Sequence, residues 1–332
     1  MDVRKKIEDL EERSLSKFSQ LAKNSRGRKN SDETCDLRTV YQVDRGRIIH
    51  SKAFRRLKHK TQVFISPEGD HYRTRLTHTL EVSQIARNVA RALLLNEDLT
   101  EAIALGHDLG HTPFGHAGES ALNEIVPGGF KHYEQSIRVV EKLEKSGKGL
   151  NLTEEVRDGI LHHTKGEWAH TLEGQLIRLA DRIAYINHDI DDAIRAKVLK
   201  SSQLPVDVMK VLGIESNFRI DTIIRSLIEN SQNGSLAMSE EVTKAFGELH
   251  EFMYEHVYRN SAAKIEAVKV PDFIKILYDY LLKNSQKWPS DIRNIAEAEG
   301  SERAVCDYIA GMTDHFAIQL FESFFIPRSW DL

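Results

Sequence analysis

The sequence predicts an all-α fold. Apolar residues recur at steps of three and four over long segments, strand-like alternation is scarce, and the chain has only 7 prolines. Its 332 residues are 40% hydrophobic and 29% charged, enough for one large core or two fused helical lobes. No segment approaches the roughly 18 consecutive apolar residues of a membrane span. With two widely separated cysteines and no signal-peptide pattern, we expect a cytoplasmic protein without membrane contact.

The chain divides into three parts by composition. Residues 1–36 predict a short surface helix over 1–22, followed by a mobile basic loop over 23–34. Residues 37–200 are expected to form the core of the fold, and residues 201–332 a C-terminal helical region packed on it. Residues 1–75 carry 19 Lys and Arg against 11 Asp and Glu, which indicates an anionic partner. A polyphosphate, a nucleic acid and a merely solvated basic surface remain open as explanations.

The clearest helix begins near His78, where apolar residues follow a regular helical period up to Leu94. A second helix is expected to start at Thr100 and to run into His107-Asp108, before Gly110 and Pro113 break it. Further helices are expected over residues 134–145, 153–162, 173 to about 200 (closed by Pro205), 218–229, 239–258, 272–287 and 301–325.

Histidines are concentrated where chemistry is expected, since 12 of the 15 lie between positions 50 and 188. Imidazole and carboxylate without thiolate suit a divalent transition metal with open coordination positions. The sequence holds two His-Asp pairs, His107-Asp108 and His188-Asp189. The first precedes a segment rich in small residues and further ionisable groups, Leu109–Glu119, so it is the better metal candidate. In the alternative interpretation, the pair caps a helix and the later histidines lie on the surface.

One face of the predicted helix over 173–200 carries a polar stripe. At 100° per residue, Asp181, Tyr185, His188 and Asp192 share this narrow face, while isoleucines and leucines form another. A solvated face is the ordinary explanation of such a stripe. A tyrosine and several metal-competent groups, in place of Lys and Glu, favour a site.

Four motifs together resemble a known family. They are Arg75–His78, His107–His111, Asp44–Leu57 and Tyr308–Asp314, and they span nearly the whole chain. The chain is similar to the HD-domain deoxynucleoside triphosphate triphosphohydrolases, often called dGTPases. The resemblance implies an HD-domain helical phosphohydrolase fold with additional C-terminal helices. It also implies one divalent metal per site, for which Mn, Mg, Fe, Co or Ni fit and Zn fits less well.

The resemblance further implies an activity and a set of roles. Members hydrolyse a dNTP, such as dGTP, to a deoxynucleoside and inorganic triphosphate. Carried over by motif, the metal ligands are His78, His107, Asp108 and Asp181. The acid/base pair is His116 and Glu119; His111, Arg75, His132 and Arg182 contact phosphates; Gln62 and Asp189 hold the sugar 3′ hydroxyl; and Tyr185 packs against the deoxyribose. Two of these roles also follow from chemistry, because a carboxylate orients and activates an imidazole and a guanidinium fork suits phosphate.

Two other functions stay open at this stage. The chain could be an HD phosphohydrolase acting on another nucleotide phosphate ester. It could also bind single-stranded nucleic acid through its basic first 75 residues, with Phe54, Phe64 and Tyr72 available for stacking. By analogy with the family we expect a homo-oligomer, and the sequence leaves open whether a dNTP also acts as an effector at a second site.

Overall fold

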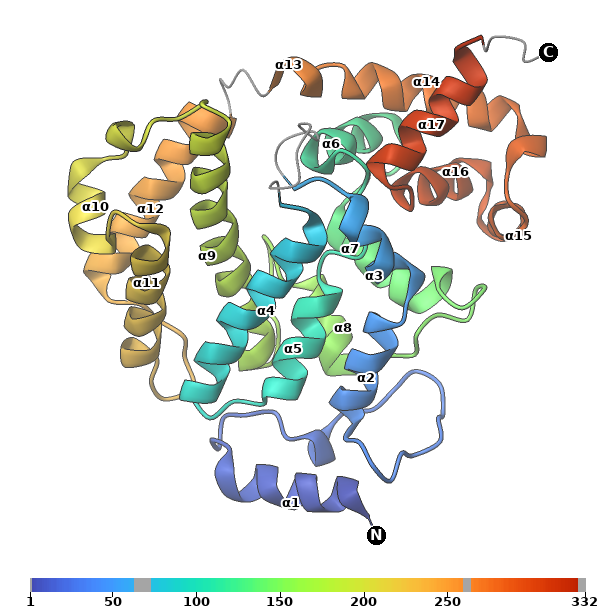
Figure 1. Ribbon diagram of the computed structural model, residues 1–332. Helices are drawn as coiled ribbons and strands as arrows, with labels where there is room; N and C mark the ends of the chain where they lie inside the picture. Colours follow the sequence, from blue (N-terminus) through green and yellow to red (C-terminus); the bar gives the residue numbers. More distant parts are fainter. Residues whose placement is uncertain (1, 63–72, 259–263, 328–332) are drawn as a thin grey trace, which may run out of the picture.

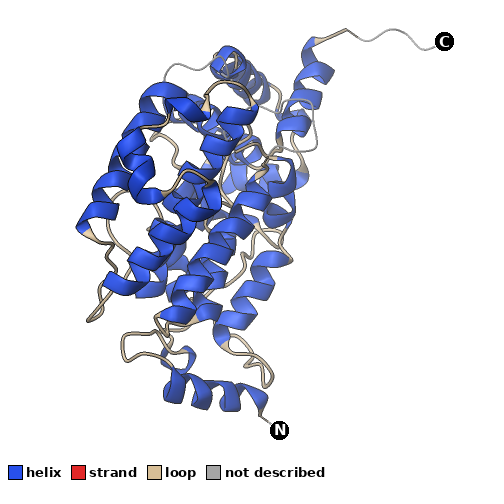
Figure 2. Ribbon diagram, turned by 60° about the vertical axis from the view of Figure 1, so that its left-hand side comes forward, coloured by secondary structure: helices blue, strands red, loops and turns tan. Residues whose placement is uncertain are grey.

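The computed structural model describes residues 2–62, 73–258 and 264–327, and over these ranges it consists of helices and loops without strands (Figures 1 and 2). Extended pairing in the described ranges is limited to two isolated bridges, Arg28 with Thr153 and Thr61 with Thr74. The predicted all-α fold is confirmed. Among the described helices, none has both the length and the apolar character needed to cross a membrane.

The longer helices follow one another in three groups along the chain. The first group is α1 (Val3–Ser14), α2 (Val40–Ile49), α3 (Lys52–Arg56), α4 (Arg75–Ala92), α5 (Glu97–Gly106) and α6 (Gly115–Ile125). The second is α7 (His132–Arg138), α8 (Glu154–Leu161), α9 (Leu172–Arg195), α10 (Val206–Leu212), α11 (Ser216–Asn230) and α12 (Glu240–Met253). The third is α13 (Lys264–Ala267), α14 (Val270–Lys283), α15 (Ser290–Glu299), α16 (Ser301–Ala310) and α17 (Asp314–Phe325).

Helices α4, α5 and α9 form the centre of the molecule, with α10–α12 and α14–α17 on different sides of it (Figure 1). The periodic apolar residues of α4 are buried as predicted, among them Val82, Ile85 and Val89. The helix starts at Arg75, earlier than expected, because the Thr74 side chain caps it by accepting from the Thr77 N–H.

The start of α5 corrects a prediction. The helix begins at Glu97, not at Thr100, because Asn96 Oδ1 accepts a hydrogen bond from the Leu99 N–H. Thr100 is buried within the helix, and its hydroxyl donates to the Asn96 carbonyl at 2.8 Å. The predicted end is close, since α5 stops at Gly106 and delivers His107-Asp108 to the following turn.

Helix α9 is shorter than predicted and ends at Arg195, not near Lys200. The backbone of Lys197 adopts a positive φ of 58°, which is incompatible with a continuing right-handed helix. Pro205 does not close this run; it stands at the N-cap of α10, where its missing N–H costs no hydrogen bond.

The C-terminal helices have a hydrophobic core of their own, which α6 shares. Leu122 of α6 packs in it with Leu277 of α14 and Ile309 of α16. The single helix expected over 301–325 is broken after Ala310, and Thr313 caps the new helix α17. Helices α2, α3 and α6 were not predicted, because no periodic pattern was found for them.

The basic loop before α2 is attached to the helical core. Glu155 of α8 accepts hydrogen bonds from the Ser25 hydroxyl at 2.8 Å and the Arg26 N–H at 2.6 Å. The Arg28 guanidinium pairs with the buried Asp44 of α2. Part of the positive charge of this segment is therefore neutralised internally.

Candidate metal centre

The turn after α5 carries the first His-Asp pair and packs directly against α7. A Cβ at Gly110 would lie 2.1 Å from the Ser136 backbone nitrogen, so only glycine fits there. The Gly110 N–H donates to the Ser136 hydroxyl at 2.9 Å, and that hydroxyl donates to the His107 carbonyl at 2.8 Å. At the other end of the turn, Gly115 has a φ of 57° and lies against the Gln62 carbonyl and Arg75. These contacts hold the turn in one position.

Three helices bring the four predicted metal ligands together. His78 comes from α4, Asp181 from α9, and His107-Asp108 from the turn after α5. His78 Nε2 lies 2.9 Å from Asp181 Oδ1, and His107 Nε2 lies 3.9 Å from the same oxygen. His107 Nε2 is 3.5 Å from Asp108 Oδ1, and donor atoms of His78, His107 and Asp108 all lie within 4.8 Å of one another.

The hydrogen bonding of His107 fits a metal ligand. Its Nδ1 donates to the Ala104 carbonyl at 2.6 Å, which places the ring proton on Nδ1 and leaves a lone pair on Nε2. This Nε2 is buried and has no hydrogen-bond partner among the described residues. A buried acceptor without a partner is costly, and a cation at this position would satisfy it. Two imidazoles and two carboxylates are a donor set for a divalent transition metal.

Asp108 is held in its ionised form. Burial by itself raises the pKa of this carboxyl, but the neighbouring imidazoles and Arg75 outweigh burial and keep the pKa well below its usual range. Arg75 Nη1 donates to Asp108 Oδ2 at 2.8 Å, and its Nε has no hydrogen-bond partner among the described residues. Arg75 therefore orients Asp108 and keeps donor capacity for an anion beside the site.

His78 and Asp181 form a second charged contact. Burial opposes a charge on either group, yet their mutual hydrogen bond raises the pKa of His78 and lowers that of Asp181. The Asp181 side chain is 23% exposed, whereas those of His107 and Asp108 are almost fully buried. The four-ligand cluster is therefore reached from the Asp181 side.

A chain of imidazoles and one carboxylate continues from Asp108. His111 Nε2 lies 3.2 Å from Asp108 Oδ1, and its ring stacks on that of His132 with centroids 4.1 Å apart. Burial and neighbouring positive charge hold the pKa of His111 well below its usual range, so this ring is neutral at pH 7. Glu119 accepts from His132 Nδ1 at 2.9 Å and lies 3.5 Å from His116 Nδ1.

Glu119 therefore contacts two histidines, and His132 is the closer of the two. Burial raises the pKa of Glu119, but hydrogen bonds from His116 and His132 bring it below its usual range, so Glu119 is ionised. The His116 side chain is 82% exposed, which leaves its ring accessible from solvent. The structure brings the predicted acid/base pair together and adds His132 to it.

The sequence analysis assigned no role to His162 or His163, yet His163 adjoins this chain. It is buried, its Nδ1 donates to the Ile160 carbonyl at 2.7 Å, and its Nε2 lies 3.3 Å from His132 Nε2. Its ring is edge-on to His107 with centroids 5.0 Å apart. Burial lowers the pKa of His163 to about 3, so its ring is neutral, and with the proton on Nδ1 its Nε2 can accept a hydrogen bond. No local pattern in the sequence distinguishes it from His162.

The predicted sugar and phosphate contacts on α9 follow Asp181 along the helix. Asp189 is buried and accepts from the Tyr258 hydroxyl. Tyr185 is half-buried, with its ring centroid 6.3 Å from that of His250. Arg182 is exposed and lies over the Phe246 ring at 5.3 Å.

The remaining predicted contacts lie before α4. Gln62 is half-buried beside Gly115, and its Oε1 has no hydrogen-bond partner among the described residues. Of the three predicted stacking residues, Phe64 and Tyr72 lie outside the described residues. Phe54 is half-buried and packs against the main core, so it is only partly available to a base.

The C-terminal region supports the site through two side-chain contacts. Asp314 accepts from the Phe114 N–H at 3.0 Å with one oxygen and from Thr61, through its N–H and hydroxyl, with the other. The buried Lys60 ammonium donates to the carbonyls of His111 and Ala310, and burial lowers the pKa of this group to about 7. The motif around Asp314 thus positions the turn that carries the candidate ligands.

This geometry agrees with comparisons to known protein families. Residues 75–186 match the HD domain, a range that contains all four candidate metal ligands. Residues 236–323 match a phosphohydrolase-associated domain. An all-α fold with a buried His-Asp cluster inside an HD domain defines a metal-dependent phosphohydrolase, and hence a hydrolase.

Curated relatives narrow the class further. The chain is 57% identical to a deoxyguanosinetriphosphate triphosphohydrolase-like protein of Caldanaerobacter subterraneus subsp. tengcongensis, over 99% of this chain and 98% of that protein. It is 50% identical to a protein of the same description from Clostridium tetani, over 99% of this chain and 97% of the relative. The chain therefore belongs to the family of deoxyguanosinetriphosphate triphosphohydrolase-like proteins.

A solved structure shares the fold at low sequence identity. A phosphohydrolase from Bacteroides thetaiotaomicron VPI-5482 superposes with a TM-score of 0.54 at 17% identity, covering 82% of this chain and 66% of that one. A protein from Aquifex aeolicus, described as hypothetical, gives a TM-score of 0.52 at 21% identity, covering 85% and 71%. At these identities the likeness concerns the fold alone.

Proposed function

We propose that this hydrolase cleaves deoxynucleoside triphosphates, dGTP among them, to a deoxynucleoside and intact inorganic triphosphate, using one divalent metal ion. The observation that carries the proposal is the convergence of His78, His107, Asp108 and Asp181 with the unpartnered Nε2 of His107 at its centre. The description of the curated relatives as deoxyguanosinetriphosphate triphosphohydrolase-like supports the choice of substrate.

The four ligands would hold the metal, and a bound divalent ion would polarise a phosphoryl oxygen and lower the pKa of a water molecule. Arg75 has a separate task. Its Nη1 is engaged by Asp108, which fixes the guanidinium plane, while its unpartnered Nε can donate to a phosphate oxygen. His111, neutral and stacked on His132, can donate or accept one hydrogen bond to a phosphate without adding charge.

Proton transfer falls to His116. Glu119 is ionised and near His116 Nδ1, so it can accept a hydrogen bond from this nitrogen and orient the ring. The exposed ring can then give the proton on Nε2 to the leaving 5′ oxygen of the sugar. His132 keeps Glu119 in place through its backbone N–H and its Nδ1.

Product analysis tests this proposal. The protein is incubated with each of the four dNTPs and Mn²⁺, and the products are separated by ion-exchange chromatography. Intact triphosphate together with the deoxynucleoside supports the proposal. Pyrophosphate plus a monophosphate contradicts it, because the wrong bond would then be broken. The same experiment ranks the four bases.

A panel of nucleoside monophosphates, cyclic nucleotides and alarmones tests the alternative substrate class on the same site. The alternative of nucleic-acid binding rested on the excess of Lys and Arg in residues 1–75. The structure supports it less, because part of this charge is paired internally. Arg45 pairs with Asp98 and Glu101, and Arg47 pairs with Asp32, which reduces the charge available to an external strand. A homo-oligomer, a dNTP effector and a cytoplasmic location stay predictions.

A further inference from the structure

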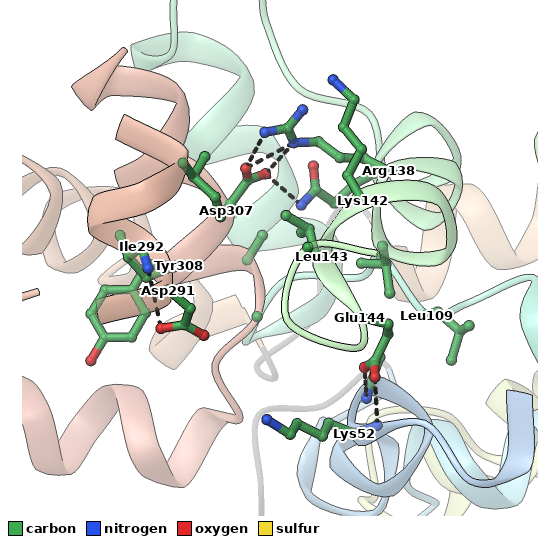
Figure 3. Close-up of a pocket in the computed structure, with 18 of the residues that line it drawn as sticks. Lys52, Leu109, Arg138, Lys142, Leu143, Glu144, Asp291, Ile292, Asp307 and Tyr308 are labelled. Atoms are coloured by element: carbon green, nitrogen blue, oxygen red, sulfur yellow. Dashed lines mark hydrogen bonds and ion pairs between the residues drawn. The ribbon is translucent and has the colours of Figure 1, made fainter. Parts of the chain in front are cut away.

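A large cavity lies beside the turn after α5. Its volume is about 890 Å³, and it is enclosed by α3, the segment from α7 to Gly147, and the helices α15 and α16 (Figure 3). Leu109 and Gly110 of the turn form part of its wall, but none of the four candidate ligands does. Cavities of this size accommodate small organic molecules, and the proposed reaction does not use this one.

Basic side chains outnumber acidic ones on the cavity wall. The basic side chains are Lys52, Arg56, Lys60, Arg138, Lys142 and Lys145, and the acidic ones are Glu144, Asp291, Glu299 and Asp307. Most of the acidic charge is already used. Arg138 pairs with Asp307 at 2.6 Å and with Glu299 at 2.7 Å, and Lys142 pairs with Glu299 at 3.0 Å.

Glu144 is engaged by the backbone. It accepts from the N–H groups of Lys52 and Ala53, at 3.1 and 2.7 Å, and so caps the first turn of α3 (Figure 3). Its charge therefore compensates the helix end and not a lysine. The one remaining acid, Asp291, accepts from the N–H of Ile292 at 3.1 Å.

Three cations, Lys52, Lys145 and Arg56, and the partly charged Lys60 are left without a carboxylate partner among the described residues. The ammonium groups of Lys52 and Lys145 have no hydrogen-bond or ion-pair partner there, and both residues are exposed. Arg56 and the buried Lys60 donate to backbone carbonyls only, Arg56 to Gly311 at 3.0 Å. The carbonyl contact of Arg56 leaves its charge uncompensated, whereas Lys60, with its pKa lowered to about 7, carries only part of a charge at neutral pH. The positive charge of Lys52, Lys145 and Arg56 therefore attracts anions to the cavity.

The opposite part of the wall is apolar and includes an aromatic ring. Ile292, Tyr308 and Phe316 line it, and Figure 3 shows Ile292 and Tyr308 across the cavity from Lys52. One ligand can therefore meet cations at one end and a flat apolar surface at the other. A simple inorganic anion would use only half of these contacts.

We propose that this cavity binds a phosphorylated small molecule that carries at least two negative charges and a flat organic group. The phosphates lie toward Lys52 and Lys145, and the organic group lies against Tyr308 and Ile292. The volume accommodates a molecule of nucleotide size. Two lysines supply mobile point charges for phosphate, and the preformed wall supplies the remaining contact area.

Calorimetry on the full chain with a chelator tests the site without turnover at the metal centre. The probes are ATP, inorganic triphosphate and adenosine. We expect ATP to bind, inorganic triphosphate to bind more weakly, and adenosine to give no measurable heat. The double variant K52Q and K145N should weaken ATP binding at least about tenfold, since two charged contacts are lost. Asn suits position 145, where φ is 50°.

The matched control removes two lysines that lie away from the cavity, K6Q and K244Q, and should leave ATP binding unchanged. Melting temperature and dNTP hydrolysis of both double variants should equal those of the parent chain, which shows that they fold. Equal losses in both double variants would overturn the proposal, because they would indicate binding by net charge alone. Absence of ATP binding in the parent chain, or loss of binding only in H107A, would also overturn it. Neither result depends on the proposed dNTP hydrolysis.

Discussion

The two His-Asp pairs of this chain have the same sequence and opposite surroundings. His107 donates from Nδ1 to a backbone carbonyl and turns an unpartnered Nε2 toward two carboxylates. His188 Nδ1 instead lies 2.8 Å from Glu81, and Asp189 accepts from the Tyr258 hydroxyl. A dipeptide therefore does not define a metal site. The neighbours that complete or leave open its hydrogen bonds do.

The two aspartates also differ in charge. Despite burial, Arg75 and the adjacent imidazoles keep the pKa of Asp108 well below its usual range, so Asp108 is a carboxylate at neutral pH. Burial raises the pKa of Asp189 to about 7, because too little nearby positive charge offsets desolvation. The first pair can bind a cation, whereas the second holds a proton near neutrality and can donate as well as accept.

The largest expected difference between the pairs is in metal binding. H107A should lose bound metal and dNTP hydrolysis together, by more than the roughly 10–100-fold that an outer-sphere change costs. D181A should behave in the same way. H188A should retain metal, because His188 is not one of the four converging ligands. Elemental analysis and a hydrolysis assay on the same samples measure both properties.

The assignment of the metal to the His107-Asp108 pair can be contradicted by experiment. His78 also lies within ligand distance of Glu81 and His188, so a metal could in principle sit on the second pair's side of His78. Full metal occupancy in H107A, with loss in H188A, would reverse our assignment. Circular dichroism of each variant confirms that the loss is local and not a consequence of unfolding.

The next prediction concerns Glu119 and distinguishes the loss of metal binding from the loss of proton transfer near His107-Asp108. E119Q should keep the metal and lower kcat by about 10²–10⁴-fold. The neutral amide can still accept a hydrogen bond from His116, but it lacks the negative charge that supports proton transfer by this ring. H132A tests the positioning of Glu119 and should lower kcat less. Unchanged turnover in E119Q would contradict the acid/base assignment, and loss of metal in E119Q would show that Glu119 acts structurally.

The helices around both pairs were largely predictable, because their apolar period reflects burial against one core. The buried positions of α4 and the apolar residues of α9, such as Ile183 and Ile186, follow this rule. The start of α5 was not predictable from the sequence. A threonine can cap a helix, or it can donate a hydrogen bond to a carbonyl one turn earlier within the helix, as Thr100 does. Local sequence does not distinguish these two cases.

The sequence indicated residues that the structure brings together, but it did not indicate their contacts. The motifs indicated His116 and Glu119, and the structure shows that His132 is the closer partner of Glu119. His163 was not predictable, because it meets His107 and His132 only through the packing of α8 beside α5 and α7. Contacts between distant segments carry no signal in a single sequence.

A smaller effect concerns the proton of the second pair. In the folded chain Asp189 retains its proton up to about pH 7, whereas in the unfolded chain it ionises near about pH 4. Between these values the folded state binds more protons, so stability falls as pH rises, by at most about 1.4 kcal/mol per pH unit from this group. D189N should remove that contribution. Urea unfolding at pH 5 and pH 7 measures the unfolding free energy of the parent chain and of D189N. An equal change in unfolding free energy between the two pH values in both proteins would contradict the raised pKa.

The smallest effect isolates the tyrosine that distinguishes the second pair from the first. Y258F removes one buried hydrogen bond and should lower the unfolding free energy by about 1 kcal/mol. The hydroxyl of Tyr258 opposes burial by lowering the pKa of Asp189, so its loss should move the Asp189 transition to higher pH. Metal content should not change, because Tyr258 touches none of the four ligands. A shift of the transition to lower pH, measured by urea unfolding across pH 5–9, would mean that Asp189 is stabilised as a carboxylate by other groups and that the two pairs are more alike than their contacts indicate.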